Sequence, residues 1–506
     1  MNPTPFAPGT RLAAQGSRLG AQGERRVVLA GVGISTQQAA PGEGVDAVAL
    51  MARAAVAAGD DAGSRRALAR TGRILVPQGT WTARDAGRSI ARAVGAESAR
   101  SVLVQIGIPQ QSLIDEALAA IAAGDVDVAL VVGGEAKRRD DQARRAGLTL
   151  APIANPRTDP DEVQTPDSEI IAPAEMETSF VVPVQQYAAI DNALRASEHQ
   201  SINEHIADID DLWSRFDAVS LDNPDAAFAA GRSPAQLRST SGGNRPLAFP
   251  YHKWHAAQWS VDQAAALLLC AAESIGPLGL DPDRALHPLV ALESSHSVSL
   301  SKRAELHRWP AMHELGAAAA AHIGRPLAEI DHIELYSCFP AAVRVQQREL
   351  GLPLDGTPTL TGGMAFAGGP FNNFVLQATA AMARRLRADG GLGLVTTVSG
   401  LLTKPGLAVW STQPGSNGPL LADLHDRAAH ATATRAVHTG YHGTAIVATY
   451  TVRFDGHGPH EVVVIADTPD DDRVVAVIHD RATAERATRE ELVGSPVHVA
   501  GAGARV

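Results

Sequence analysis

A unit of helix, glycine and apolar strand occurs early in the chain and limits what the rest can fold into. Its helix is predicted at the start of residues 110–134, where apolar side chains recur at the spacing of one helical face. Gly124 follows the last turn, at the place where a left-handed glycine commonly ends a helix. The run 126–132 is then almost wholly apolar, which is typical of a strand covered on both faces.

The same unit returns downstream at a constant distance. Residues 372–387 predict a second helix, and a second apolar strand follows it. Gly124 corresponds to Gly390 and Gly133 to Ser399, so both pairs lie 266 residues apart (390 − 124 and 399 − 133). Two such units predict an α/β chain with a duplicated core, in which the two helices direct their N-termini at a shared centre.

Composition narrows the class of protein. The length of 506 residues indicates several domains, and a net charge of −11 argues against a nucleic-acid partner. The only cysteines are Cys270 and Cys338, so neither a disulfide framework nor a cysteine-rich metal site is expected. The longest apolar run, residues 264–272, is about half of the ~18 residues that cross a bilayer. We therefore expect a cytoplasmic protein with no membrane contact.

Changes in amino-acid composition and polarity along the chain predict its division into domains. Residues 1–25 are rich in Pro, Gly and Gln without an apolar stretch, and we expect a disordered leader there. Two α/β halves, 26–137 and 261–414, flank a polar and irregular insert at 138–260. An insert of this length is expected to form a loop or lid domain that carries binding function, or else a variable surface excursion.

Residues 415–506 predict an additional small β domain. Apolar strands flank the hairpin turn 455–458, and a third strand is expected at 473–478. We expect a small β-barrel of the OB type. Its acidic turns and its lack of aromatic rows argue against nucleic acid as its ligand.

Several longer motifs accompany the repeat. AxxxIAAGDVDVALVVGG ends the first unit, and DQAAALLLCA opens the second half at Asp262. YSCFPAA begins at Tyr336, GGMAFAGGP at Gly362 and SGLLTKPG at Ser399. Together these motifs resemble the thiolase superfamily over residues 26–412, most closely its thiolase-like proteins near the SCP2-type thiolases, and they are similar to acetyl-CoA acetyltransferases. The resemblance implies the duplicated, five-layer αβαβα thiolase fold.

The resemblance also implies a chemistry whose residues are largely missing. A thiolase carries a thiolate nucleophile at the N-terminus of its first central helix, a second cysteine as acid and base, and a histidine at an oxyanion hole. Here the nucleophile position falls on Gly107, and the first half contains no cysteine. Gly368-Gly369-Pro370 replaces the GHP motif, and Tyr336 replaces the asparagine or histidine of the next motif. The cysteine of the last strand has become Val398 or Ser399.

Cys338 alone matches a reactive position, because it stands where SCP2-type enzymes have the cysteine of their HDCF motif. We predict it as the catalytic residue of any remaining chemistry; the alternative is a small buried apolar side chain. The predicted substrate-binding residues are Gly107, Tyr336, Gly368, Gly369 and Ser399. Alternatively, Tyr336 only fills volume, and the two glycines of the GGP motif serve a tight turn, with or without an anion nest. No metal site is expected.

Three other patterns are weaker. Ser299–Lys302 matches the SxxK motif of acylated serines, but no KTG motif follows. Residues 31–33 read Gly-Val-Gly and lack the third glycine of a dinucleotide loop. His252 and His255 are spaced HxxH without an acidic partner at metal-ligand spacing, so a hydrogen-bonded or surface role is favoured.

Three hypotheses about function follow. The first is a protein that binds an acyl-CoA or related ligand without normal thiolase activity, because loss of a nucleophile–base pair costs ~10⁴–10⁶ in rate. The second is a weak acyltransferase or thioesterase that uses Cys338. The third is a non-catalytic assembly protein that binds a partner through residues 415–506. A coenzyme A thioester is the expected ligand in the first two, and no resident cofactor is expected.

Overall fold

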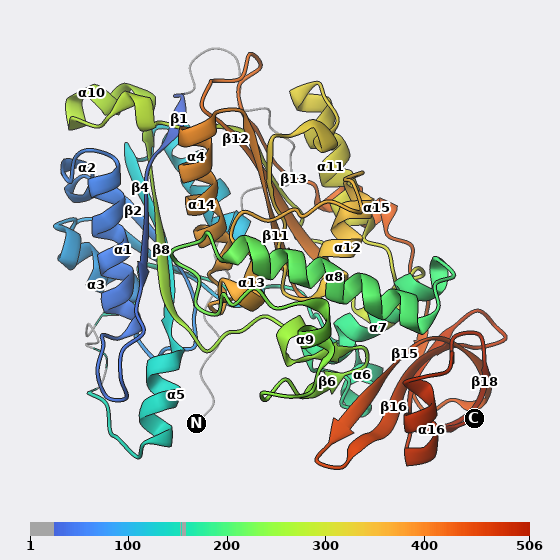
Figure 1. Cartoon of the computed structure of the whole chain (residues 1–506). Coiled ribbons are helices and arrows are strands. Elements are labelled where there is room, and N and C mark those ends of the chain that lie inside the picture. The colour runs from blue at the N-terminus through green and yellow to red at the C-terminus, as the bar shows by residue number, and fades with distance from the viewer. Residues whose placement is uncertain (1–24, 152, 154–157) are drawn as a thin grey trace.

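The computed structural model describes residues 25–151, 153 and 158–506, so the predicted leader lies outside the described residues apart from Arg25. Two mixed sheets carry the α/β part of the chain, and helices lie outside and between them (Figure 1). From left to right in Figure 1 the order is helix, sheet, helix, sheet, helix, with the C-terminal domain at the lower right. This order confirms the predicted five layers.

Each sheet brings together strands from distant parts of the sequence. In spatial order, the first sheet contains β1 (Val27–Thr36), β8 (Asp262–Ala271), β4 (Val128–Ala136), β2 (Arg73–Pro77), β3 (Arg100–Val104) and β5 (Glu162–Gln164). The second sheet contains, in spatial order, β10 (His332–Glu334), β11 (Leu392–Ser399), β12 (Lys404–Ser411), β9 (His287–Glu293) and β13 (Leu420–Asp423).

The two sheets repeat one pairing pattern, as the sequence repeat predicts. In the first, β4 is parallel to β2 and antiparallel to β8, which is antiparallel to β1. In the second, β11 is parallel to β10 and antiparallel to β12, which is antiparallel to β9. All residues of β4 and β8 are buried, because both faces of this sheet are covered by helices.

Two helices lie between the sheets and contact both of them: α4 (Gln110–Ala122) and α14 (Phe374–Asp389). These are the helices of the sequence repeat. The outer face of the first sheet carries α1 (Ala47–Asp61), α2 (Arg66–Ala69) and α3 (Ala86–Val94). The far side of the second sheet carries α11 (Pro310–Ile323) and α12 (Pro340–Glu349), and shorter helices are α10 (Ile275–Leu278), α13 (Gly363–Phe366) and α15 (His425–Ala431).

The insert is more regular than its sequence predicts. It contains α5 (Lys137–Arg145), α6 (Pro173–Glu177), α7 (Pro183–Ser197), α8 (Ile202–Ser220), α9 (Pro234–Arg238), β6 (Pro246–Ala248) and β7 (Tyr251–His252). A polar and irregular sequence does not indicate long helices, yet α7 and α8 have 15 and 19 residues. Buried polar side chains, among them Asp191, Arg195 and His205, interrupt their apolar periodicity.

The C-terminal domain is a closed five-stranded barrel, which confirms the predicted small β-barrel. Its strands are β15 (His442–Asp455), β16 (Gly458–Asp467), β17 (Arg473–Ile478), β19 (Gly503–Arg505) and β18 (Pro496–Ala500), each paired to the next and the last to β15. The domain also contains α16 (Arg481–Ala487) and β14 (Val437–His438). Since β13 pairs with β9, the chain leaves the second sheet at Asp423 rather than at residue 415.

The barrel is joined to the insert through polar contacts that are themselves buried. Asn192 of α7 donates to the carbonyl oxygen of Tyr450 at 3.0 Å, and Thr449 donates to the carbonyl oxygen of Ala189 at 2.5 Å. Arg195, only 1% exposed, forms an ion pair with Glu491. A buried polar group without a hydrogen-bond partner costs free energy, so these contacts fix the barrel against α7. In the described ranges no helix is both long and apolar enough to cross a membrane.

Candidate functional site

The N-termini of the two central helices meet, as predicted. Gln110, the first residue of α4, accepts a hydrogen bond through Oε1 from the backbone N–H of Val375 at 2.9 Å. Val375 is the second residue of α14, so a side chain of one central helix caps the other. The ring of Phe374 lies edge-to-face with Tyr336 at a centroid distance of 5.9 Å. The duplicated core therefore brings three chain segments to one centre.

Gly107 occupies the turn before α4. Its φ of +104° suits glycine, and a Cβ there would approach Pro166 to 3.2 Å. Its carbonyl oxygen accepts a hydrogen bond from Nζ of Lys404, a side chain that is only 3% exposed. The same Nζ lies 3.3 Å from Oγ of Ser168. A buried ammonium thus stands next to the predicted nucleophile position.

Sequence reasoning missed Lys404, although it lies in the SGLLTKPG motif. The sequence did contain a signal for it. Lys404 begins a strand whose other residues are apolar or small, and a lysine buried in such a strand needs a polar partner. Its partners Gly107 and Ser168 lie 297 and 236 residues away in sequence, so no local pattern identifies them.

Cys338 is buried beneath aromatic side chains. It is 8% exposed, and its neighbours Tyr187 and Phe339 stack at 4.6 Å. Burial raises the pKa of the Cys338 thiol to about 12, although a hydrogen bond with Tyr187 acts in the opposite direction. At neutral pH the side chain is therefore a thiol and not a thiolate. This environment suits a small buried side chain, and a catalytic role for Cys338 stays a prediction.

Tyr336 is held by its backbone in the loop between β10 and α12. Its N–H donates to Oγ1 of Thr396 at 2.8 Å, and its carbonyl oxygen accepts from Gln346 at 2.9 Å. Burial raises the pKa of the Tyr336 hydroxyl, so this group stays protonated and is able to donate. Ser399 is half-buried and pairs with Lys404 across the β11–β12 turn.

The Gly368-Gly369 turn packs tightly against the start of β8. Gly368 has a φ of +105°, and a Cβ there would collide with the Gln263 side chain. The N–H of Gly369 donates to the carbonyl oxygen of Gln258 at 3.0 Å. That N–H is therefore already paired and is not free to form an anion nest. The tight-turn interpretation of these glycines fits the geometry.

The HxxH pair lies away from the centre, in the insert. Nε2 of His255 is 2.9 Å from Oδ1 of Asp210, and burial lowers the pKa of His255. Burial and the neighbouring His255 lower the pKa of His252 to about 4. His255 is therefore a packed, hydrogen-bonded histidine, whereas His252 is half-buried and its Nδ1 has no hydrogen-bond partner among the described residues. Within the described part of the chain, no group of three His, Cys, Asp or Glu side chains is placed to hold a metal ion.

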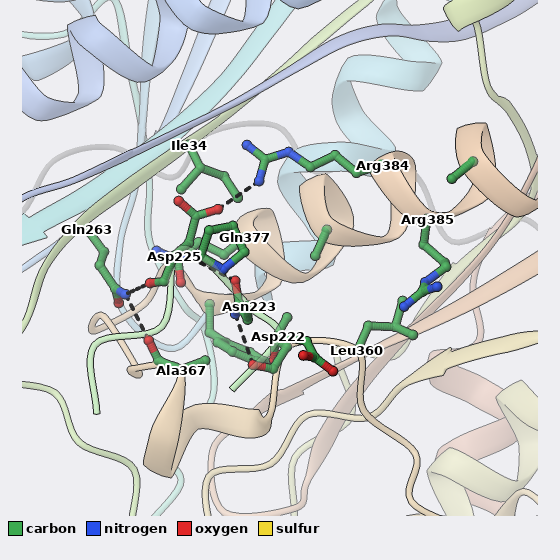
Figure 2. A pocket seen from close by; sticks show the side chains of 15 residues that line it. Ile34, Asp222, Asn223, Asp225, Gln263, Leu360, Ala367, Gln377, Arg384 and Arg385 are labelled. Carbon is green, nitrogen blue, oxygen red and sulfur yellow. Dashed lines mark hydrogen bonds and ion pairs between the residues drawn. The ribbon is translucent and has the colours of Figure 1, made fainter. Parts of the chain in front are cut away.

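A cavity of about 260 Å³ lies beside the centre, between α14 and the insert (Figure 2). Its inner end is lined by Phe374 and Gln263, which contact Tyr336 and Gly368 respectively. The predicted binding residues themselves are not among its lining residues. The cavity therefore adjoins the predicted site from the side of α14.

Comparison with known proteins supports the same architecture. A family model described as the thiolase-like protein type 1 additional C-terminal domain matches residues 425–504. The solved structure of a monomeric SCP2-thiolase like protein type 1 (STLP1) from Mycobacterium smegmatis is 25% identical, with a TM-score of 0.80, over 96% of this chain and 99% of that one. The fold is that of the thiolase-like proteins. The predicted resemblance is thereby confirmed, and the barrel lies in the region of the additional domain.

Two more distant structures show this fold alone. The Ltp2-ChsH2(DUF35) aldolase is 18% identical with a TM-score of 0.57, over 77% of this chain and 98% of the other. The acetyl-CoA acetyltransferase from Syntrophomonas wolfei is 17% identical with a TM-score of 0.55, over 77% and 100%. A comparison with curated proteins found no match.

Proposed function

We propose that this thiolase-like chain binds an acyl-CoA or related thioester ligand and does not carry out normal thiolase turnover. The observation that carries the proposal is the buried Lys404 ammonium at the carbonyl of Gly107, beside the start of α4. The N–H groups at a helix N-terminus favour a thioester carbonyl or an anion at this place, and Nζ of Lys404 holds the turn before that helix through the carbonyl of Gly107.

The same geometry argues against thiolase chemistry. Gly107 has no side chain to accept an acyl group, and Gly369 has no imidazole at the GHP position. The Cys338 thiol, with a pKa of about 12, is ionised to about one part in 10⁵ at pH 7. Covalent catalysis by the family route would therefore have neither its nucleophile nor its base.

Ligand binding is tested by thermal unfolding of the full chain with and without acetyl-CoA. Saturation at about 100 times the Kd stabilises the folded state by about 2.7 kcal/mol. We expect a ligand-dependent rise in Tm that Lys404→Met reduces, while Lys302→Met, at an exposed lysine, leaves it unchanged. No rise at millimolar acetyl-CoA, or brisk cleavage of acetoacetyl-CoA by the purified chain, contradicts the proposal.

Two alternatives predict different results. A weak acyltransferase or thioesterase that depends on Cys338 shows thioester turnover that Cys338→Ser abolishes. An assembly protein shows neither binding nor turnover alone, and needs residues 415–506 to associate with a catalytic partner. One structure of similar fold is named for two components, Ltp2 and ChsH2(DUF35), and this name motivates the second alternative, the assembly protein.

A further inference from the structure

Lysine is rare in this chain, and one of its few lysines is buried at the centre. Of the 44 basic side chains only four are lysine: Lys137, Lys253, Lys302 and Lys404. The first two are half-buried and the third is exposed, whereas Lys404 is only 3% exposed. Lysine is almost never fully buried unless its position demands an amine, so the placement of Lys404 calls for a chemical reason.

The contacts of Lys404 place its amine beside the predicted nucleophile position and close to the surface. Nζ donates to the carbonyl oxygen of Gly107 and lies 3.3 Å from Oγ of Ser168. Ser168 is half-buried, and its neighbours Asp167 and Glu169 are exposed. Nζ therefore lies directly beneath a surface loop of the insert, next to the place where the resemblance expects a reactive thiol.

The turn that carries Lys404 holds it in a fixed position. Residues 400–402 have φ values of +66°, +59° and +56°, although the last two are leucines, for which a positive φ is unfavourable. Contacts with the rest of the protein must hold such a turn. Arg303, 5% exposed, donates to the carbonyl oxygen of Leu401 at 2.6 Å. Lys404 begins β12 two residues after this turn, so its amine is held in place before any ligand binds.

Two properties of this place suit a nitrogen nucleophile. Burial disfavours the charged form of a lysine, so a buried ammonium gives up its proton to become a neutral amine more readily than an exposed one. The neutral amine attacks carbonyl carbon. In addition, α4 begins three residues after Gly107, and the first N–H groups of a helix have no partner within it. These groups favour the negative oxygen that forms when an amine adds to a thioester.

We infer that Lys404 accepts the acyl group of a bound thioester, so that the chain acylates itself once and does not turn over. The inference rests on the proposed function and names the group with which the bound thioester reacts. Nζ adds to the thioester carbonyl carbon and a C–N bond forms. The C–S bond then breaks, and the leaving thiolate takes a proton from the nitrogen. The products are an amide on Lys404 and a thiol, and no oxidant or further reactant is consumed.

Peptide mapping by mass spectrometry after incubation of the full chain with acetyl-CoA tests the inference. In the folded chain Lys404 should gain an acetyl group about tenfold faster than Lys302, or more, because a bound thioester is held beside it. Lys302 is exposed and serves as the internal control for reaction with dissolved acetyl-CoA. In guanidinium the preference for Lys404 should disappear. Hydroxylamine should leave the adduct in place, since it cleaves thioesters and not amides.

Lys404→Arg is the matched variant. Arginine keeps the positive charge and a donor for the carbonyl of Gly107, but its guanidinium stays protonated and does not accept an acyl group. The variant should keep a rise in Tm with acetyl-CoA and gain no acetyl group at residue 404, while Lys302→Arg should keep the adduct on Lys404. If the larger guanidinium prevents folding, the peptide map of the unaltered chain still decides the question.

The outcomes separate this inference from the proposed function. If acetyl-CoA raises the Tm but Lys404 shows no preference over Lys302, the assignment of Lys404 as acyl acceptor is wrong while the proposed function stands. An adduct on Ser168 or Cys338 in place of Lys404 also overturns the assignment and leaves binding intact. If acetyl-CoA at millimolar concentration neither raises the Tm nor modifies Lys404, both are wrong.

Discussion

Oε1 of Gln110 accepts a hydrogen bond from the backbone N–H of Val375, 265 residues further along the chain, at 2.9 Å. The two residues lie at the starts of the two central helices, and Gln110 is 4% exposed. A helix leaves its first N–H groups unpaired unless a side chain, water or ligand accepts from them. One half of the duplicated core thus satisfies a donor of the other.

Gln110→Ala should lower the free energy of unfolding by about 1–3 kcal/mol, because the Val375 N–H would then be buried without an acceptor. Urea unfolding followed by circular dichroism measures the change. Gln413→Ala is the control, since Gln413 is exposed and should shift stability by less than about 0.5 kcal/mol. Equal stability of both variants would contradict a structural role for the cross-half bond.

The elements of the core were predictable because their apolar periods are long and are repeated. The predicted strand 126–132 overlaps β4, which spans Val128–Ala136, and the second central helix begins at Phe374, two residues later than predicted. Asn373 precedes it with a non-helical φ of −139°, a local detail that the apolar period does not contain. The apolar run after Asp262 is compatible with either a strand or a buried helix; in the structure it forms β8, which is covered by helices on both faces.

The site was predictable only in part. Family motifs placed Gly107, Tyr336 and the GGP turn near one centre, but they did not reveal Lys404 or the cavity beside α14. Both depend on segments far apart in sequence, such as the insert loop that faces Arg384. A sequence pattern describes neighbours along the chain and does not identify contacts between segments that are far apart in sequence.

The two thiols provide a second prediction. Burial raises the pKa of Cys270 and of Cys338 to about 12 in each case. In the native chain at pH 8 we expect slow reaction of both with a disulfide reagent, because the thiolate is the reactive form. Unfolding in guanidinium should release two rapidly reacting thiols. A native cysteine that reacts as fast as free cysteine, and is lost in Cys338→Ser, would instead indicate an activated Cys338.

Glu334 predicts a pH dependence of stability. It is fully buried, and burial raises its pKa to about 7 even though Thr359, Leu360 and Thr361 donate hydrogen bonds to its carboxylate. The unfolded value is about 4.3, so between pH 4.3 and 7 the folded state binds more protons. Stability should therefore fall as pH rises through this window, by roughly 4 kcal/mol in total.

Urea unfolding at pH 5 and pH 8 measures the effect of Glu334. The variant Glu334→Gln does not titrate, so its free energy of unfolding should change less between the two values than that of the unaltered chain. Glu329→Gln, at an exposed carboxylate, should keep the original pH dependence. A parallel pH profile for Glu334→Gln and the unaltered chain would mean that Glu334 does not contribute to it.

A last prediction concerns the ion network that joins the insert to the second half of the core. Asp191 of α7 is fully buried and accepts from the hydroxyl of Tyr251 at 2.5 Å and from Arg344 of α12 at 3.1 Å. His205 of α8 lies 3.4 Å from the same carboxylate. Although burial alone would raise the pKa of Asp191, these partners lower it to about 2.

Asp191→Asn should destabilise the protein by about 3–5 kcal/mol, because it removes the nearer carboxylate of the buried Arg344 guanidinium and leaves the more distant carboxylate of Glu198, 3.5 Å away. Asp211→Asn breaks an exposed pair with Arg215 and should cost no more than about 1 kcal/mol. Since the folded pKa of Asp191 lies below the unfolded value of about 3.9, its stabilisation is present above pH 4 and is lost as pH falls toward 2. Asp191→Asn should therefore flatten the acid limb of the stability profile, whereas Asp211→Asn should preserve it. A variant as stable as the unaltered chain would show that the Asp191 carboxylate does not contribute to holding the insert against α12.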